Sequence, residues 1–247
     1  MGRRPGRFSK RALDISAGAL CLAASSPFLV AIAIAIKLSD RGPVLFRQVR
    51  VGRDGDPFEM LKFRTMVVDA ERLQAELQPL NERDGPLFKI AGDPRVTPVG
   101  RFLRRTNLDE LPQLLNVLAG SMSLVGPRPA LPAEVASFST SLRSRERVKP
   151  GITGPWQLQA GDDPSFESYR RLDEDYIANW TVATDLRIIR ATIAQATRRV
   201  LDGIVRCPHA KPGRLPPPPS HLRPLTDPSA ATAERASRGH GRDLGQA

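Results

Sequence analysis

The sequence predicts a helix-rich mixed α/β domain that follows a membrane-inserting helix at the N-terminus. The first observation is an apolar run at residues 12–36, which is about as long as a bilayer crossing requires. The second is that the chain then alternates between strand-like and helix-like patterns, with more helix than strand. The strand-like runs cover residues 44–52 and 57–66, and the helical ones include 67–77, 111–118 and 180–201.

Pro27 lies at the centre of the apolar run and Asp14 near its start, and both disfavour a simple transmembrane span. Proline removes a helix hydrogen bond and kinks or breaks the helix, while Ser25 and Ser26 just before it can satisfy freed carbonyls. We therefore expect a sharp bend at Ser26 and Pro27. Basic residues flank both ends of the run, so charge gives no direction of crossing. Hydropathy alone leaves a straight span and a re-entrant helix open, and it disfavours a cleaved signal peptide because the run is long.

The positive charge is concentrated outside the expected domain. Of the formal net charge of +11, residues 1–11 contribute +5 and residues 207–247 contribute +3, which leaves +3 for residues 12–206. This near-neutral middle argues against a nucleic-acid-binding face, so membrane phosphates are the better anionic partner. The chain thus divides into a basic N-terminus with the membrane helix at 1–38, a folded domain at 39–206 and a disordered Pro-rich tail beyond it.

Histidine and cysteine are missing from residues 39–206, since all three histidines lie in the tail and the two cysteines are Cys21 and Cys207. Zinc sites built on these residues, Cys–His nucleophiles and Ser–His–Asp triads are therefore excluded from the domain. No disulfide framework is indicated, which fits a domain that faces the cytosol. Chemistry in the domain must use carboxylates, lysine, arginine or hydroxyl groups.

An acidic pair, Asp109 and Glu110, is the most informative candidate site. It opens a helix-like run, with Arg104 before it and Arg128 after it. If a helix begins near Asp109, Pro112 falls in the first turn, where its missing N–H costs little and the positive helix end favours ionised acids. Neighbouring helix positions point about 100° apart, so one acid can attack a substrate while the other holds a cation. The alternative is simple helix capping.

Three further basic residues are candidates for binding phosphate. Pro127 and Pro129 stiffen the backbone on both sides of Arg128, and a preorganised guanidinium suits bidentate phosphate binding. Lys62 and Arg64 are two residues apart, which places them on one face if they belong to a strand. The alternatives are an ordinary surface turn and a solvent-facing strand.

Five sequence blocks, in order, resemble the bacterial sugar transferase family of polyprenyl-phosphate phosphoglycosyl transferases, in its monotopic and minimal form. They are KRALDI with the apolar run and SSP, LKFRTM, LDELPQLLNVL, SLVGPRP and KPGITG, and they cover about residues 10–201. The resemblance implies a re-entrant helix broken at Ser26 and Pro27, with a catalytic domain on the cytoplasmic face of the bacterial inner membrane. It implies transfer of a hexose 1-phosphate from a nucleoside-diphosphate sugar, UDP-linked, to polyprenyl phosphate, which begins assembly of a surface glycan.

The resemblance also implies roles for the candidate residues. Asp109 matches the nucleophile that forms a covalent aspartyl-phosphosugar intermediate, and Glu110 matches the acid that binds Mg²⁺. Lys62, Arg104 and Arg128 match basic positions near the substrate phosphates. Cations at these positions would offset the repulsion between a carboxylate and an anionic phosphate.

The chain departs from the family pattern after Trp156 and Gln157, where the usual Gly-Arg is absent. The resemblance therefore does not carry the family's substrate contacts over to that segment. The alternative function is a catalytically inactive, membrane-tethered binding or scaffold protein of the same fold. The intact candidate residues argue against this alternative, and a nucleic-acid-binding module is suggested only by the high isoelectric point.

Overall fold

The computed structural model describes residues 6–82, 90, 92–138, 142–159 and 166–205. The tail predicted from residue 207 onward, with its histidines and Cys207, lies outside this part of the chain. The α-helices are α1 Gly6–Asp40, α2 Gln74–Leu77, α3 Pro98–Thr106, α4 Gln113–Ala119, α5 Pro132–Ala136, α6 Pro155–Gln159, α7 Phe166–Ala178 and α8 Val182–Val205. The strands are β1 Leu45–Val51, β2 Pro57–Phe63, β3 Ser123–Val125 and β4 Gly151–Thr153. Short 3₁₀ turns are η1 Arg53–Gly55, η2 Gln78–Leu80, η3 Leu108–Glu110 and η4 Leu142–Arg147.

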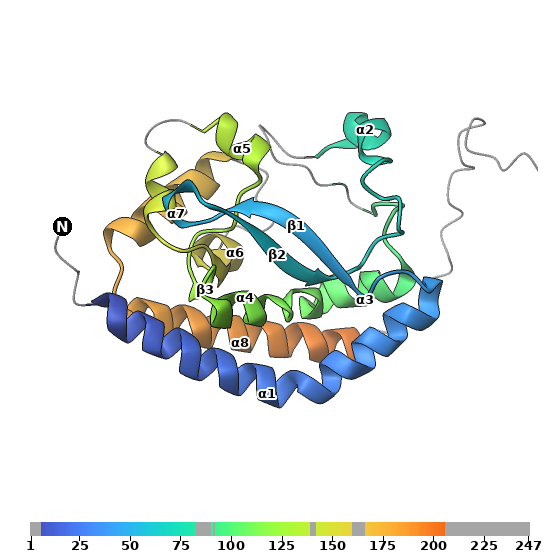
Figure 1. Cartoon of the computed structure of the whole chain (residues 1–247), viewed down its shortest axis with the longest axis horizontal. Coiled ribbons are helices and arrows are strands. Elements are labelled where there is room, and N and C mark those ends of the chain that lie inside the picture. Colours follow the sequence, from blue (N-terminus) through green and yellow to red (C-terminus); the bar gives the residue numbers. More distant parts are fainter. Residues whose placement is uncertain (1–5, 83–89, 91, 139–141, 160–165, 206–247) are drawn as a thin grey trace, which may run out of the picture. The chain divides into compact units, whose positions relative to one another are not determined.

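Helix α1 is continuous through Pro27, so the predicted interruption of the helix is not observed. The helix nevertheless bends near its middle (Figure 1). Pro27 cannot donate to the carbonyl of Ala23, and the hydroxyl of Ser26 donates to that carbonyl instead, at 2.8 Å. The freed carbonyl is thus satisfied within the helix, as the serines before the proline led us to expect.

Both halves of α1 pack on the domain, and Figure 1 shows the helix running beneath α4 and α8. Asp14, in the first half, is buried and accepts hydrogen bonds from the Ser123 hydroxyl and the Leu124 N–H, both at 2.9 Å. Ile32 and Ile36, in the second half, are buried in one cluster with core residues of β2 and α3. The helix is long and apolar enough to cross a membrane, yet its two ends contact the same domain.

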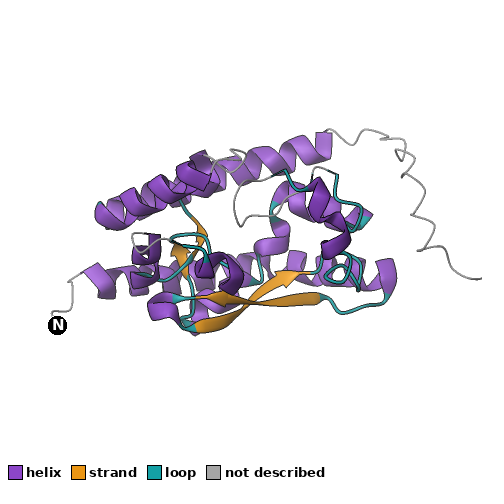
Figure 2. Ribbon diagram, turned by 90° about the horizontal axis from the view of Figure 1, so that it is seen from above, coloured by secondary structure: helices purple, strands orange, loops and turns teal. Residues whose placement is uncertain are grey.

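The β1–β2 hairpin lies on one side of the molecule and most of the helices on the other (Figure 2). The strands pair antiparallel, from Leu45 opposite Phe63 to Val51 opposite Pro57. Asn116 docks α4 onto β2: its side chain accepts from the Leu61 N–H at 3.0 Å and donates to the Glu59 carbonyl at 2.7 Å. This side chain fixes the distance between β2 and the segment that precedes α4.

Two expected elements differ from the observed ones. The predicted helix at 67–77 is a series of turns through residue 73, and only Gln74–Leu77 is α-helical. The segment 148–154, interpreted as a loop, contains β4, which pairs in parallel with β3. Gly126 and Gly151 allow this pairing, because a Cβ on Gly151 would lie 2.1 Å from the Gly126 nitrogen. The helices expected at 111–118 and 180–201 are present as α4 and α8.

Candidate functional site

The acidic pair lies in a short 3₁₀ turn between two helices. Helix α3 ends at Thr106, and Asn107 adopts the left-handed conformation with φ 57°, which turns the chain into η3. Asp109 and Glu110 occupy η3, and α4 begins only at Gln113. The expectation that the acids occupy the first turn of an α-helix was therefore wrong, because the left-handed residue separates the two helices and a tighter turn intervenes.

Asp109 is the buried member of the pair, with only 8% of its surface exposed. No side chain in the described part of the chain donates a hydrogen bond to its carboxylate. Burial is the largest influence on the pKa of this carboxylate, and a hydrogen bond from a backbone N–H is the smallest. A desolvated carboxylate is a stronger nucleophile than a hydrated one.

Glu110 is the partly exposed member of the pair, and it bonds to Lys62. The Lys62 ammonium donates to Glu110 Oε1 at 2.6 Å, and their side chains are 26% and 32% exposed. Lys62 reaches η3 because β2 and η3 lie side by side. Lys62 and the two acids, which are 47 and 48 residues away in the sequence, therefore form one site.

The protonation of Asp109 is set by burial and by these neighbours. Burial raises its pKa to about 6, Lys62 and Arg104 lower it, and the adjacent Glu110 raises it. The carboxylate is consequently ionised at neutral pH and becomes protonated in mildly acidic solution.

Arg104 lies in the last turn of α3, within electrostatic reach of Asp109. Its Nε donates to the hydroxyl of Thr65 at 2.8 Å. Helix α3 can approach this closely because of Gly100, on which a Cβ would lie 1.9 Å from the Thr65 carbonyl oxygen. The structure thus brings Asp109, Glu110, Lys62 and Arg104 together.

Arg64 does not join this group. Strand β2 ends at Phe63, and the Arg64 guanidinium donates to both carboxylate oxygens of Asp40, at the end of α1. Its Nε donates to the carbonyl of Pro43. Arg64 therefore anchors the end of α1, and the predicted shared face with Lys62 is absent because the strand stops between them.

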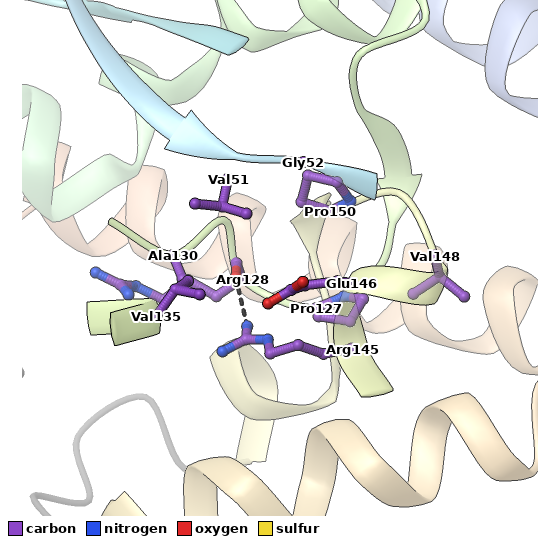
Figure 3. A pocket seen from close by; sticks show the side chains of 10 residues that line it. All are labelled: Val51, Gly52, Pro127, Arg128, Ala130, Val135, Arg145, Glu146, Val148 and Pro150. Atoms are coloured by element: carbon purple, nitrogen blue, oxygen red, sulfur yellow. Dashed lines mark hydrogen bonds between the residues drawn. The ribbon is translucent and has the colours of Figure 1, made fainter. Parts of the chain in front are cut away.

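Arg128 lies at a second, very small pocket, of about 20 Å³, shown in Figure 3. Its guanidinium contacts the buried carboxylate of Glu134 at 3.2 Å, and its carbonyl accepts from Arg145, as the dashed line shows. A volume of this size holds roughly one water molecule, not a nucleotide. The stiff Pro-Arg-Pro backbone is present, but it directs Arg128 to Glu134.

The hairpin separates Arg128 from the acidic pair. Ala130 bridges to Val51 at one end of the hairpin, whereas Lys62 lies near the other end, opposite Phe46. The five residue steps from Pro57 to Lys62 span about 17 Å at 3.3 Å per residue. The sequence placed Arg128 beside the acids, and the structure places it at the far end of β2.

A magnesium ion would find few protein ligands here. Among the described residues, no group of three or more His, Cys, Asp or Glu side chains could hold a metal. Mg²⁺ is often held by one or two carboxylates together with substrate phosphates and water. Glu110 fits this arrangement, because its Oε1 accepts from Lys62 and its Oε2 accepts from no residue that the structure describes.

Three residues that shape the site were missed in the sequence. Asn107 makes the turn, Asn116 positions β2, and Thr65 binds Arg104. Only Asn107 had a readable signal, since asparagine after a helical run is typical of a left-handed C-terminal cap. The other two act through contacts across the fold, which sequence spacing does not reveal.

Comparison with known proteins identifies similar chains. Residues 5–199 match the family model described as bacterial sugar transferase. The chain is 38% identical over 192 residues to the exopolysaccharide production protein ExoY of Sinorhizobium fredii, covering 76% of this chain and 85% of that protein. It is 38% identical over 206 residues to the undecaprenyl-phosphate galactose phosphotransferase of Salmonella typhimurium, covering 81% of this chain and 42% of that protein.

A third relative is the UDP-glucose:undecaprenyl-phosphate glucose-1-phosphate transferase of Escherichia coli. It is 43% identical over 196 residues, which cover 76% of this chain and 40% of that protein. The chain therefore spans about two fifths of the length of several curated relatives and most of the length of ExoY.

Proposed function

Because the chain belongs to the bacterial sugar transferase family, we propose that it transfers a hexose 1-phosphate from a nucleoside-diphosphate sugar to polyprenyl phosphate. The observation that carries the proposal is the grouping of Asp109, Glu110, Lys62 and Arg104, with a buried carboxylate between cations. The names of the relatives above point to UDP-galactose and UDP-glucose as the first donors to test.

In the first step, a carboxylate oxygen of Asp109 attacks the β-phosphorus of the donor. The new oxygen–phosphorus bond forms as the bond to the nucleoside monophosphate breaks, and the sugar phosphate remains on Asp109 as a mixed anhydride. Lys62 and Arg104 reduce the repulsion between the attacking carboxylate and the anionic phosphate. Burial assists as well, since it removes water that would otherwise solvate the nucleophile.

In the second step, a phosphate oxygen of polyprenyl phosphate attacks the same phosphorus. The bond to Asp109 breaks, the carboxylate is regenerated, and the product is a polyprenyl diphosphate sugar that can begin a surface glycan. Asp109 is the nucleophile of the first step and the leaving group of the second, so the donor and the acceptor react in turn.

Glu110 would hold Mg²⁺ through Oε2 together with substrate phosphates. The ion supplies charge stabilisation for the phosphoryl oxygens and the leaving group. Lys62 keeps the Glu110 carboxylate oriented toward the site through its hydrogen bond at 2.6 Å.

The packing of α1 supports a re-entrant membrane helix. A straight span would carry one end of the helix to the opposite membrane surface, whereas Asp14 and Asp40 both contact the same domain. The middle of the helix exposes large apolar side chains, such as Leu20 at 71% and Phe28 at 67%, which fits contact with lipid. We place the domain on the cytoplasmic face of the bacterial inner membrane.

Cysteine labelling in intact cells tests this topology. Phe8 and Arg72 are 85% and 79% exposed, so each can be replaced by cysteine in a chain that lacks Cys21 and Cys207. We expect both positions to resist an impermeant maleimide in cells and to react after lysis. If only Phe8→Cys is labelled in intact cells, the helix is a straight transmembrane span and the re-entrant topology is wrong.

A trapping experiment tests the transfer itself. Protein in nanodiscs is incubated with Mg²⁺ and a donor labelled in the sugar phosphate, without lipid acceptor. We expect one equivalent of nucleoside monophosphate and a labelled chain, and chase with polyprenyl phosphate should remove the label. A protein that binds donors without releasing monophosphate would instead be the inactive scaffold.

A further inference from the structure

A cavity of about 890 Å³ lies at the end of α4 opposite to the Asp109–Glu110 pair. It opens between the first turns of α1, the η1 turn, the segment before β4 and the end of α7, and neither acid of the pair lines it. The seven residues of α4 separate the two sites by about 10 Å at 1.5 Å per residue. The basic residues that line the cavity are Lys10, Arg11, Arg53, Arg147 and Lys149.

Three acidic residues also line the cavity, against five basic ones, which leaves a formal charge of +2. Asp14 is occupied by two hydrogen bonds from the β3 segment, at 2.9 Å each. Glu174 pairs with Arg170 at 2.9 Å. Asp54 alone pairs with a lining cation, Arg53, at 3.0 Å.

Three of the five cations therefore have no acidic partner in the described chain. Lys10 pairs with Asp185 at 2.6 Å, whereas Arg11 donates only to two neutral backbone carbonyls at the end of α4. Arg147 and Lys149 make no hydrogen bond or ion pair with the residues that the structure describes. The cavity thus carries a net positive charge that its own walls do not neutralise.

The backbone holds two of these cations close together. Gly120 ends α4 with φ 93°, and a Cβ on it would lie 3.4 Å from Arg11 Nη2 and 3.5 Å from Lys149 Nζ. The two distances together limit the separation of these nitrogens to 6.9 Å. Burial lowers the pKa of Lys149, the charges of Arg11 and Arg53 lower it further, and the charge of Asp14 raises it. Like charges held at this distance are mutually repulsive until an anion lies between them.

The position and lining of the cavity indicate the kind of anion. Lys10 and Arg11 immediately precede the apolar run at 12–36, so the cavity lies where that run enters the membrane surface. Apolar side chains also line it, among them Ile177 and Trp180. A ligand with a phosphate and an adjoining apolar part fits both features.

We infer that this cavity binds the phosphate ester of a membrane lipid head group, with Arg11, Arg147 and Lys149 as its cations. An ammonium and guanidinium groups supply charge-assisted hydrogen bonds to phosphate oxygens. The bound lipid would hold the start of α1 at the membrane surface. This site is separate from the transfer site, so the inference goes beyond the proposed activity.

Calorimetric titration of the full chain in a neutral detergent tests the inference, with dihexanoyl phosphatidylglycerol below its micelle concentration as the probe. We expect saturable binding of one equivalent, weakened about tenfold by Lys149→Gln or by Arg147→Gln, which corresponds to about 1.4 kcal/mol. Arg72→Gln removes the same charge from an exposed side chain outside the cavity and should leave binding unchanged. Asp109→Asn should also leave it unchanged.

Other outcomes would overturn the inference. Equal weakening by Arg72→Gln would indicate a nonspecific charge effect, and loss of binding in Asp109→Asn would move the lipid to the transfer site. The same titration is repeated with inorganic phosphate as the probe. If inorganic phosphate binds as tightly as the lipid, the site recognises free phosphate instead. Lack of saturable binding in the wild-type chain would refute the site altogether.

Discussion

Replacing Asp109 by asparagine should abolish transfer and, at the same time, make the protein more stable. The amide keeps the shape of the side chain, but it cannot attack phosphorus. The stability change follows from the burial of the carboxylate, which is 8% exposed and has a pKa of about 6 against an ordinary value of 3.8. Such a rise means that the folded protein holds the charged form less favourably than the unfolded chain does.

The size of the effect follows from linkage between proton binding and folding. Each tenfold change in proton affinity is worth about 1.36 kcal/mol, so the ionised Asp109 destabilises the fold by up to about 3 kcal/mol above pH 6. The attraction of Lys62 and Arg104 is already contained in that pKa. Burying the amide of asparagine also costs free energy, which cancels part of this difference. We therefore expect Asp109→Asn to be more stable than the wild type by about 1–2 kcal/mol at pH 7.5.

The sign of the pH dependence is also fixed. The folded state binds the Asp109 proton more tightly, so the contribution of Asp109 to wild-type stability falls as pH rises from about 4 to about 6 and is then constant. The destabilisation by Asp109 falls to about 1.6 kcal/mol at pH 5, while the cost of the buried amide does not change with pH, so the advantage of the asparagine variant should nearly vanish there. Thermal unfolding in nanodiscs at the two pH values measures this, with Asp69→Asn, a 70% exposed acid, as the control.

A variant that is no more stable than the wild type at pH 7.5 would refute this reasoning, because the carboxylate would then not be desolvated in the folded state. An asparagine variant that still acquires labelled sugar phosphate would remove Asp109 from the mechanism as well. The two results are independent, so the electrostatic argument and the catalytic one can fail separately.

Three more changes have definite expected results. Glu110→Gln should lose most activity and recover part of it at raised Mg²⁺, unlike Asp109→Asn, as measured by nucleoside monophosphate release. Lys62→Met should move the acidic limb of the pH–rate profile to higher pH, because Lys62 lowers the pKa of Asp109; single-turnover release between pH 5 and 8 checks this. Asp14→Ala should cost about 1–3 kcal/mol in thermal unfolding, because two donors of the β3 segment lose their buried acceptor.

The sequence predicted those parts of the fold that depend on residues close together in the chain. The hairpin strands and α8 follow from periodicity, and the serine hydroxyl beside Pro27 satisfies the freed carbonyl as expected. The break predicted in α1 is not observed, and the same hydrogen bond accounts for this: the Ser26 hydroxyl satisfies the carbonyl to which Pro27 cannot donate. The sequence did not indicate that β2 ends at Phe63. It therefore did not indicate that Arg64 pairs with Asp40, away from Lys62.

The sequence indicated only some of the residues that lie together in the candidate site. The adjacent acids and the need for cations could be read directly, but the identity of the neighbouring cations depends on which elements pack together. Lys62 reaches Glu110 across the fold, while Arg128 binds Glu134 six residues away. Sequence proximity to the acids favoured Arg128 and gave no sign that the length of the hairpin separates them.

The attachment of both ends of α1 to one domain has a consequence for how the chain enters a bilayer. In the proposed re-entrant topology, a helix fixed at Asp14 and Asp40 enters as a loop, with only its apolar middle submerged. Neither basic flank then passes through the electric field of the membrane, where each elementary charge moved would cost about 2.3 kcal/mol per 100 mV. Insertion of α1 should accordingly be independent of membrane voltage. The loop adds area to one leaflet alone, so we expect its insertion to depend on how tightly the lipids of that leaflet pack.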